Sequence, residues 1–240
     1  MRHAPQNALA SVIGTLAAEK SPACLLDTQG VFLFVNEAWD RHAAANGGAP
    51  GCLGSSLIGT PWLGHIRGET VRRLHATLLE QALRWRGPQA RPVVQVGEVN
   101  TPTVAALVSS RFEPVLQGSE PLAVRIVHAT LRERPVSEVY ELVERPPETY
   151  RDAGGAIVQC SCCRRVRDPS QPERWDFVPA LVAEPLATAQ EVCELCAELH
   201  YVGLEASGSE PHACVVPAVV PARACHGRDG RAAGFAREEA

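Results

Sequence analysis

The sequence predicts an α+β protein with a five-stranded antiparallel sheet and helices packed on one face, followed by a small cysteine-rich module. Two observations carry this prediction. Strand-like and helix-like patterns follow one another over the first 135 residues in the order two strands, helices, three strands. Seven of the nine cysteines then crowd after residue 159, in a stretch too short to bury a core of its own.

The first predicted element is an amphipathic helix within residues 1–20. Its apolar residues recur at helical spacing, and Ser21-Pro22 ends the pattern. These residues are Leu9, Val12, Ile13, Leu16 and Ala17. Such a face fits either a helix packed on its own domain or a helix used for dimerisation or signalling, and the sequence leaves both open.

A β-hairpin feeding directly into a helix is predicted next. Two apolar runs within residues 23–36 flank Asp27-Thr28-Gln29-Gly30, whose composition suits a tight turn. Asn36 then stands where an N-cap residue would, and residues 37–45 read as a helix that ends near Asn46-Gly47-Gly48.

A longer helix and three strands complete the first part. Apolar residues keep helical spacing from Glu69 to Trp85, and Gly87-Pro88 stops the pattern. Three β-like runs follow at 92–99, 103–115 and 121–131, each bounded by Pro, Gly, Asn or Ser. Two strands, helices and three strands indicate one antiparallel sheet.

Two stretches of the chain resemble the PAS domain, and the resemblance covers residues 21–135. The first, "LLDTQGVFLFVNEAWDR", is similar to the opening strand, Asp-x-x-Gly turn, strand and helix of that family. The second, "VNTPTVAALVSSRFEPVL", is similar to the late sheet strands of a bacterial subgroup. The resemblance implies a sensor of small molecules, redox state or light that signals to a protein partner, and a homodimer is a further expectation. It does not identify a ligand.

Two segments outside this domain are predicted to lack a regular fold. Residues 136–155 are polar and contain a Pro-Pro and a Gly-Gly pair, which indicates a linker. Residues 205–240 are rich in Ala, Gly, Arg, Pro and Glu without clear periodicity, which indicates a poorly ordered tail.

Residues 156–204 contain two C-x-x-C pairs, Cys160 with Cys163 and Cys193 with Cys196, separated by twenty-nine residues. Four thiolates match the tetrahedral preference of Zn²⁺ and leave no open position for water, so the site would be structural. Such a metal would supply the stability that a module of this size lacks. The residues between the pairs can form a hairpin, and the second pair can open a helix.

The cysteine-rich segment also resembles the C-terminal part of bacterial PAS-containing sensory proteins. That part has the pattern C-x-x-C-[KR]-[KR]-[IV]-R-D followed by a Trp and a second cysteine pair. Here the matching residues run from Cys160 to Asp168, with Trp175 beyond them and Cys193-Glu-Leu-Cys196 after that. The resemblance implies a zinc-ribbon-like or treble-clef-like module.

Two other interpretations of this segment stay open. A thioredoxin-like redox dithiol would also use a C-x-x-C pair, although no βαβ pattern follows this one. The arginines at 164, 165 and 167 suggest a nucleic-acid binder such as a zinc-ribbon transcriptional regulator. The formal net charge of −4 favours instead a solvated strand face, with these arginines paired to Asp168 or Asp176.

Several single residues remain as weaker candidates. Cys162 is the spare cysteine of the first cluster and is expected to be a bystander. His200 follows the last cysteine of the second pair, where we expect a surface histidine rather than a ligand, and Cys214 with Cys225-His226 is spaced too irregularly for a metal site. His75 stands on a helix, as a haem ligand would, but its neighbours Arg72 and Arg73 favour a surface position.

Function classes can also be excluded from the sequence. No phosphate-binding loop, dinucleotide fingerprint, zinc-protease motif or nucleophile elbow occurs, so we expect no enzymatic activity. No apolar run approaches the roughly 18 residues of a membrane span, and the N-terminus lacks the apolar region of a signal peptide. A cytoplasmic protein without membrane contact is therefore expected.

Overall fold

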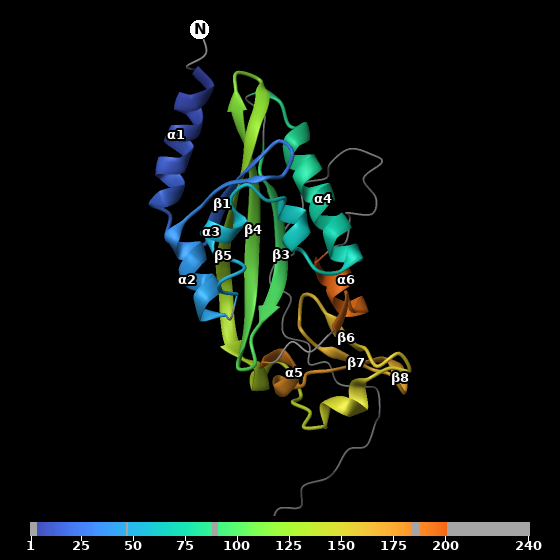
Figure 1. Ribbon diagram of the computed structural model, residues 1–240. Helices are drawn as coiled ribbons and strands as arrows, with labels where there is room; N and C mark the ends of the chain where they lie inside the picture. The colour runs from blue at the N-terminus through green and yellow to red at the C-terminus, as the bar shows by residue number, and fades with distance from the viewer. Residues whose placement is uncertain (1–3, 47, 88–90, 184–187, 201–240) are drawn as a thin grey trace, which may run out of the picture.

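The computed structural model describes residues 4–46, 48–87, 91–183 and 188–200. A five-stranded sheet has the order β2-β1-β5-β4-β3, and every neighbouring pair is antiparallel (Figure 1). Its strands are β1 (Ala23–Asp27), β2 (Phe32–Val35), β3 (Val93–Asn100), β4 (Val104–Gln117) and β5 (Glu120–Pro135). The predicted α+β class with a five-stranded antiparallel sheet is confirmed.

The first hairpin and the helix after it meet at one buried side chain, Asn36, which is 1% exposed. Its Oδ1 accepts hydrogen bonds from the backbone N–H of Trp39 at 2.9 Å and of Ala23 at 3.0 Å. The first of these caps helix α2 (Glu37–Ala45), as predicted. Its Nδ2 donates to three carbonyls between residues 16 and 21, so Asn36 ties the N-terminal helix to the sheet.

Helices cover both faces of this sheet, which corrects the predicted one-face arrangement. Helix α4 (Glu69–Arg84), helix α3 (Gly54–Leu57) and the 3-10 helix η1 (Trp62–His65) pack on one face, and α1 (Ala4–Ala17) packs on the other (Figure 1). Alternate residues of β1 explain the difference, because Cys24 and Leu26 join the first core while Ala23 and Leu25 join the second. Helix α1 thus packs on its own domain.

A second sheet has the order β8-β7-β6-β9. Its strands are β6 (Ile157–Cys160), β7 (Val166–Asp168), β8 (Gln171–Asp176) and β9 (Thr188–Glu191). Strands β7 and β8 form the hairpin predicted between the cysteine pairs, whereas β6 and β9 are parallel. Helices α5 (Pro179–Ala183) and α6 (Glu194–His200) accompany this sheet, which lies at one end of the first (Figure 1).

The segment 136–155 connects the two sheets, as a linker does, but parts of it are packed. It contains the 3-10 helices η3 (Val136–Glu138) and η4 (Pro147–Tyr150). Val136 and Tyr150 are buried, and the Tyr150 hydroxyl donates to Asp176 Oδ2 at 2.7 Å. A few apolar side chains spaced among polar ones anchor this segment, a pattern that gives no helical or strand periodicity.

No helix in the described ranges has the length and hydrophobicity that a membrane span needs. The predicted tail at 205–240 lies outside the described residues, and so do Cys214 and Cys225-His226.

Candidate metal centre

The first cysteine pair lies in the tight turn that joins β6 to β7. Cys160 is the last residue of β6, and its backbone N–H donates to the Arg165 carbonyl at 2.8 Å. The N–H of Arg164 donates back to the Cys160 carbonyl at 3.0 Å, and Arg164 adopts a φ of 65°. The chain thereby reverses around the pair, so Cys160 and Cys163 face the same point.

The second pair reaches that point because β9 runs parallel to β6. Their register places Glu191 opposite Cys160, so Cys193 emerges beside the first pair. The backbone N–H of Cys193 lies 3.4 Å from Cys160 Sγ and donates to it. Helix α6 then begins at Glu194 and returns Cys196 to the same side, and the Ala197 N–H bonds the Cys193 carbonyl at 2.9 Å.

The four sulfurs converge in a space that fits one metal ion. The Sγ atoms of Cys160, Cys163, Cys193 and Cys196 all lie within 4.8 Å of one another, and each residue is at most 1% exposed. Cys163 and Cys193 Sγ are 3.7 Å apart. Tetrahedral zinc with bonds of about 2.3 Å separates its sulfurs by about 3.8 Å, whereas a disulfide needs about 2.05 Å. No cysteine in the described ranges forms a disulfide.

Sulfurs this close compete for protons when no cation lies between them. Hydrogen bonds from Cys162 and then Cys163 hold the pKa of the Cys160 thiol below its ordinary value. The pKa values of Cys163 and Cys196 are raised in return, first by hydrogen bonding to Cys160. A divalent cation removes this competition because it binds all four sulfurs as thiolates. The arrangement is therefore chemically suited to a metal.

Two further side chains touch the sulfurs, on different edges of the cluster. The Arg165 guanidinium donates to Cys163 Sγ and to Cys193 Sγ, each at 3.2 Å. The thiol of Cys162, which is 6% exposed, hydrogen-bonds with Cys160 and Cys196. Cys162 is not one of the four sulfurs that could share an ion. The role of Arg165 is not predicted from the sequence, although its position two residues after Cys163 is a usable signal.

The predicted pairing of the arginines with Asp168 or Asp176 is wrong. Arg167 instead bonds Glu191 at 2.9 Å and lies over the Trp175 ring, 5.9 Å from its centroid. Successive residues of a strand point to opposite faces, so Arg167 cannot share the inward face that holds the buried Asp168.

The two aspartates have other partners. Asp168 accepts from Arg145 at 3.1 Å, and Asp176 accepts from Arg174 at 2.8 Å. Arg164 donates to Gln159 Oε1 at 3.4 Å. The three arginines that suggested a polyanion-binding site thus all contact groups of the protein itself. Arg164 contacts Gln159, Arg165 contacts two sulfurs and Arg167 contacts Glu191.

Two half-buried histidines lie in the first domain, His75 on α4 and His128 on β5. The ring of His75 stacks on Trp62 with centroids 5.2 Å apart, and its Nδ1 is buried without a hydrogen-bond partner in the described residues. His128 of β5 contacts Ser110 Oγ through Nδ1 at 2.8 Å. Burial lowers the pKa of both imidazoles to about 4, and the charges of His75 and His42 contribute at His128.

The surface position predicted for His75 is therefore wrong. Its place on α4 explains why, because it follows the buried Val71 by four residues and precedes the buried Leu78 and Leu79 by three and four. The same spacing in the sequence was a signal for burial. The alternative of a haem ligand remains a hypothesis.

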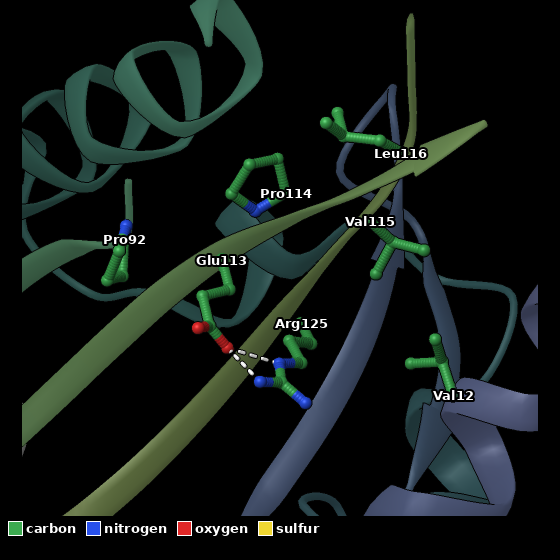
Figure 2. Close-up of a pocket in the computed structure, with 7 residues that line it drawn as sticks. All are labelled: Val12, Pro92, Glu113, Pro114, Val115, Leu116 and Arg125. Carbon is green, nitrogen blue, oxygen red and sulfur yellow. Dashed lines mark hydrogen bonds and ion pairs between the residues drawn. The ribbon is translucent and has the colours of Figure 1, made fainter. Parts of the chain in front are cut away.

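The opposite face of the sheet carries a hollow of about 350 Å³ beside α1. Figure 2 shows Val12 on one side, Pro92 on the other, and the ion pair between Glu113 and Arg125 between them. Burial raises the pKa of Glu113, but the hydrogen bond and charge of Arg125 outweigh it, so the net shift is downward. The charged side chains that line this hollow, Glu113 and Arg125, therefore neutralise each other.

Cys24 and Cys52 are not part of the metal centre, and the side chain of His200 lies outside the described residues. Cys24 is buried in β1, where burial raises its thiol pKa, and Cys52 is exposed. His200 is the last residue of α6, and the placement of its side chain lies outside what the structure describes.

Comparisons with known proteins give partial structural likeness only. No protein-family model and no curated protein matches the chain. Among solved structures, the PAS domain of Bordetella pertussis BvgS is similar at 16% identity, with a TM-score of 0.40 over 53% of this chain and 89% of that one.

Two further solved structures are similar over about half of this chain. The Drosophila melanogaster Cycle PAS-B domain with bound ethylene glycol is 14% identical, with a TM-score of 0.34 over 46% of this chain and 99% of that one. The Rhodobacter sphaeroides LOV protein is 14% identical, with a TM-score of 0.38 over 52% of this chain and 68% of that one.

Proposed function

We propose that the chain is a non-enzymatic signalling protein in which a PAS-type sensory domain, residues 21–135, is joined to a module built on a structural zinc ion. Cys160, Cys163, Cys193 and Cys196 would be the four ligands. The single observation that carries the zinc site is the convergence of these four buried sulfurs within 4.8 Å.

The chemistry of the donor set supports zinc over harder cations. Four thiolates are soft ligands, which suit Zn²⁺, whereas Ca²⁺ and Mg²⁺ take oxygen donors. Four protein ligands also complete the tetrahedron, so bound water would have no place as a nucleophile. The metal would then hold β6, β9 and α6 together instead of performing a reaction.

The sensory part of the proposal is supported by the arrangement of the first sheet. Its helix-covered interior combines aromatic rings with two imidazoles that burial keeps neutral, and these are the groups that a small molecule bound there would contact. A change in that interior would shift the population of domain states and be read by a protein partner. The engaged arginines of the second module support a protein partner over nucleic acid.

Native mass spectrometry of the reduced full chain tests the proposal. We expect one zinc per chain, and we expect Cys193→Ser to lose it. Cys52→Ser is the matched control, because Cys52 is exposed and lies outside the cluster. Metal-free protein after purification with zinc and reductant, or a Cys160–Cys163 disulfide in its place, would overturn the zinc site.

A further inference from the structure

The metal centre is capped on one edge by a single charged group. Arg165 donates through Nε to Cys163 Sγ and through Nη2 to Cys193 Sγ, both at 3.2 Å. These sulfurs are themselves 3.7 Å apart, so one planar guanidinium spans the edge between them. Four thiolates around a divalent cation carry a net charge of −2, and a cation held on two of them offsets part of that charge.

Arg165 is held in this position from behind. Its guanidinium carbon lies 5.6 Å from the centroid of the Tyr140 ring, within the range of a cation–π contact. The Tyr140 ring is in turn stacked on the buried Phe177, with centroids 5.1 Å apart and planes 5° apart. The orientation of Arg165 is therefore fixed by packing as well as by the sulfurs.

The stacked rings of Tyr140 and Phe177 form a platform under Arg165. The Tyr140 hydroxyl connects this platform to the first sheet. It donates to Glu98 of β3 and accepts from Asn100 Nδ2 at 3.3 Å. The same Asn100 amide donates to the carbonyl of Cys163 at 2.9 Å. Asn100 is 5% exposed, and its Oδ1 is buried without a hydrogen-bond partner in the described residues. The end of β3 thus touches both the platform and the backbone of a ligand.

We propose that Arg165 sets the metal affinity of the four-cysteine centre, and that Tyr140 and Asn100 make this affinity depend on the folded end of β3. The inference rests on the zinc site proposed above and adds its regulation. Because coupling between two sites is reciprocal, metal binding then also stabilises the end of β3. Arg165 and Tyr140 are positioning residues that act through the cysteines.

The test measures zinc affinity of the reduced full chain by competition with a chromophoric chelator. Removal of an outer-shell partner typically weakens metal binding by about 10-fold to 100-fold, and we expect a loss in this range for Arg165→Gln. Arg165→Lys should recover part of it, because the charge is restored but the ammonium on its flexible stem lacks the rigid planar fork that aims Nε and Nη2 at two separate sulfurs. Arg167→Gln is the matched control: it removes the same charge from a neighbouring position that bonds Glu191.

A second measurement addresses the link to the sheet. Tyr140→Phe keeps the ring under Arg165 and removes only the hydroxyl contacts to Glu98 and Asn100. We expect Tyr140→Phe to lose less zinc affinity than Arg165→Gln. In the double variant, the fold-loss of affinity should be smaller than the product of the two single fold-losses. In the Co²⁺-substituted protein, Arg165→Gln should also shift the thiolate-to-metal charge-transfer band, which a purely structural role would leave in place.

The outcomes separate the two proposals. A folded wild-type chain that binds no zinc overturns the metal site and this inference with it. Wild-type binding with unchanged affinity in Arg165→Gln, or an equal loss in Arg167→Gln, overturns the inference alone. If Arg165→Gln does not fold, Arg165→Lys decides, since affinity equal to wild type in that variant would mean that the bidentate cap has no role.

Discussion

The half-buried imidazoles of His75 and His128 predict that the first domain loses stability in mild acid. Burial lowers both pKa values from the ordinary 6.5 to about 4. The unfolded chain therefore binds protons at a higher pH than the folded one. The stabilising effect of keeping these rings neutral is fully present above pH 6.5 and is lost progressively as the pH falls from 6.5 to 4.

The size of the effect follows from the same two pKa values. At pH 5 the linkage relation gives a loss of about 2 kcal/mol for each imidazole relative to pH 7.5. The two together amount to about 4 kcal/mol, a large share of the roughly 5–15 kcal/mol by which domains are stable. Urea unfolding followed by tryptophan fluorescence at pH 7.5, 6 and 5 measures this directly.

His75→Phe isolates one of the two groups from every other acid-labile interaction. A phenyl ring can stack on Trp62 as the imidazole does, and Nδ1 gives up no hydrogen bond to a described residue. The variant should lose about 2 kcal/mol less than wild type between pH 7.5 and 5. In the exposed control His42→Gln most of the pH dependence should remain. Equal pH dependence in wild type and His75→Phe would refute the reasoning.

Three further predictions concern stability. Asn36→Ala removes a helix cap and leaves the buried Ala23 N–H unpaired, so the free energy of unfolding in urea should fall by about 2–4 kcal/mol; a loss under 1 kcal/mol would contradict this role. Tyr150→Phe removes a buried hydrogen bond to Asp176, and chemical unfolding should show a loss of about 2 kcal/mol. Zinc chelation should accelerate amide hydrogen exchange in β6 and β9 more than in β1, and uniform protection would argue against a structural metal.

Local patterns in the sequence determined much of this protein. Alternation and turn residues identified the hairpin at 23–36, and the side chain of Asn36 marked the start of α2. The paired C-x-x-C spacing selected the four cysteines that the fold brings together. These features depend on neighbours within a few residues, so the order of residues is enough to predict them.

Other features depend on contacts that no local pattern encodes. The parallel pairing of β6 with β9 is what carries Cys193 to Cys160, and its partners lie about thirty residues apart. The placement of α1 on the second face of the sheet follows from burial of β1 on both sides, which only the packed structure fixes.

The partners of charged and polar side chains were likewise decided by tertiary structure. Arg165 reads as a solvated residue in the sequence, yet the turn between β6 and β7 aims it at two sulfurs, and Tyr140 from the connecting segment supports it. Composition and spacing show which charged and polar side chains the protein has. Which of them meet is set by long-range burial, because apolar area removed from water is gained only when distant segments pack together.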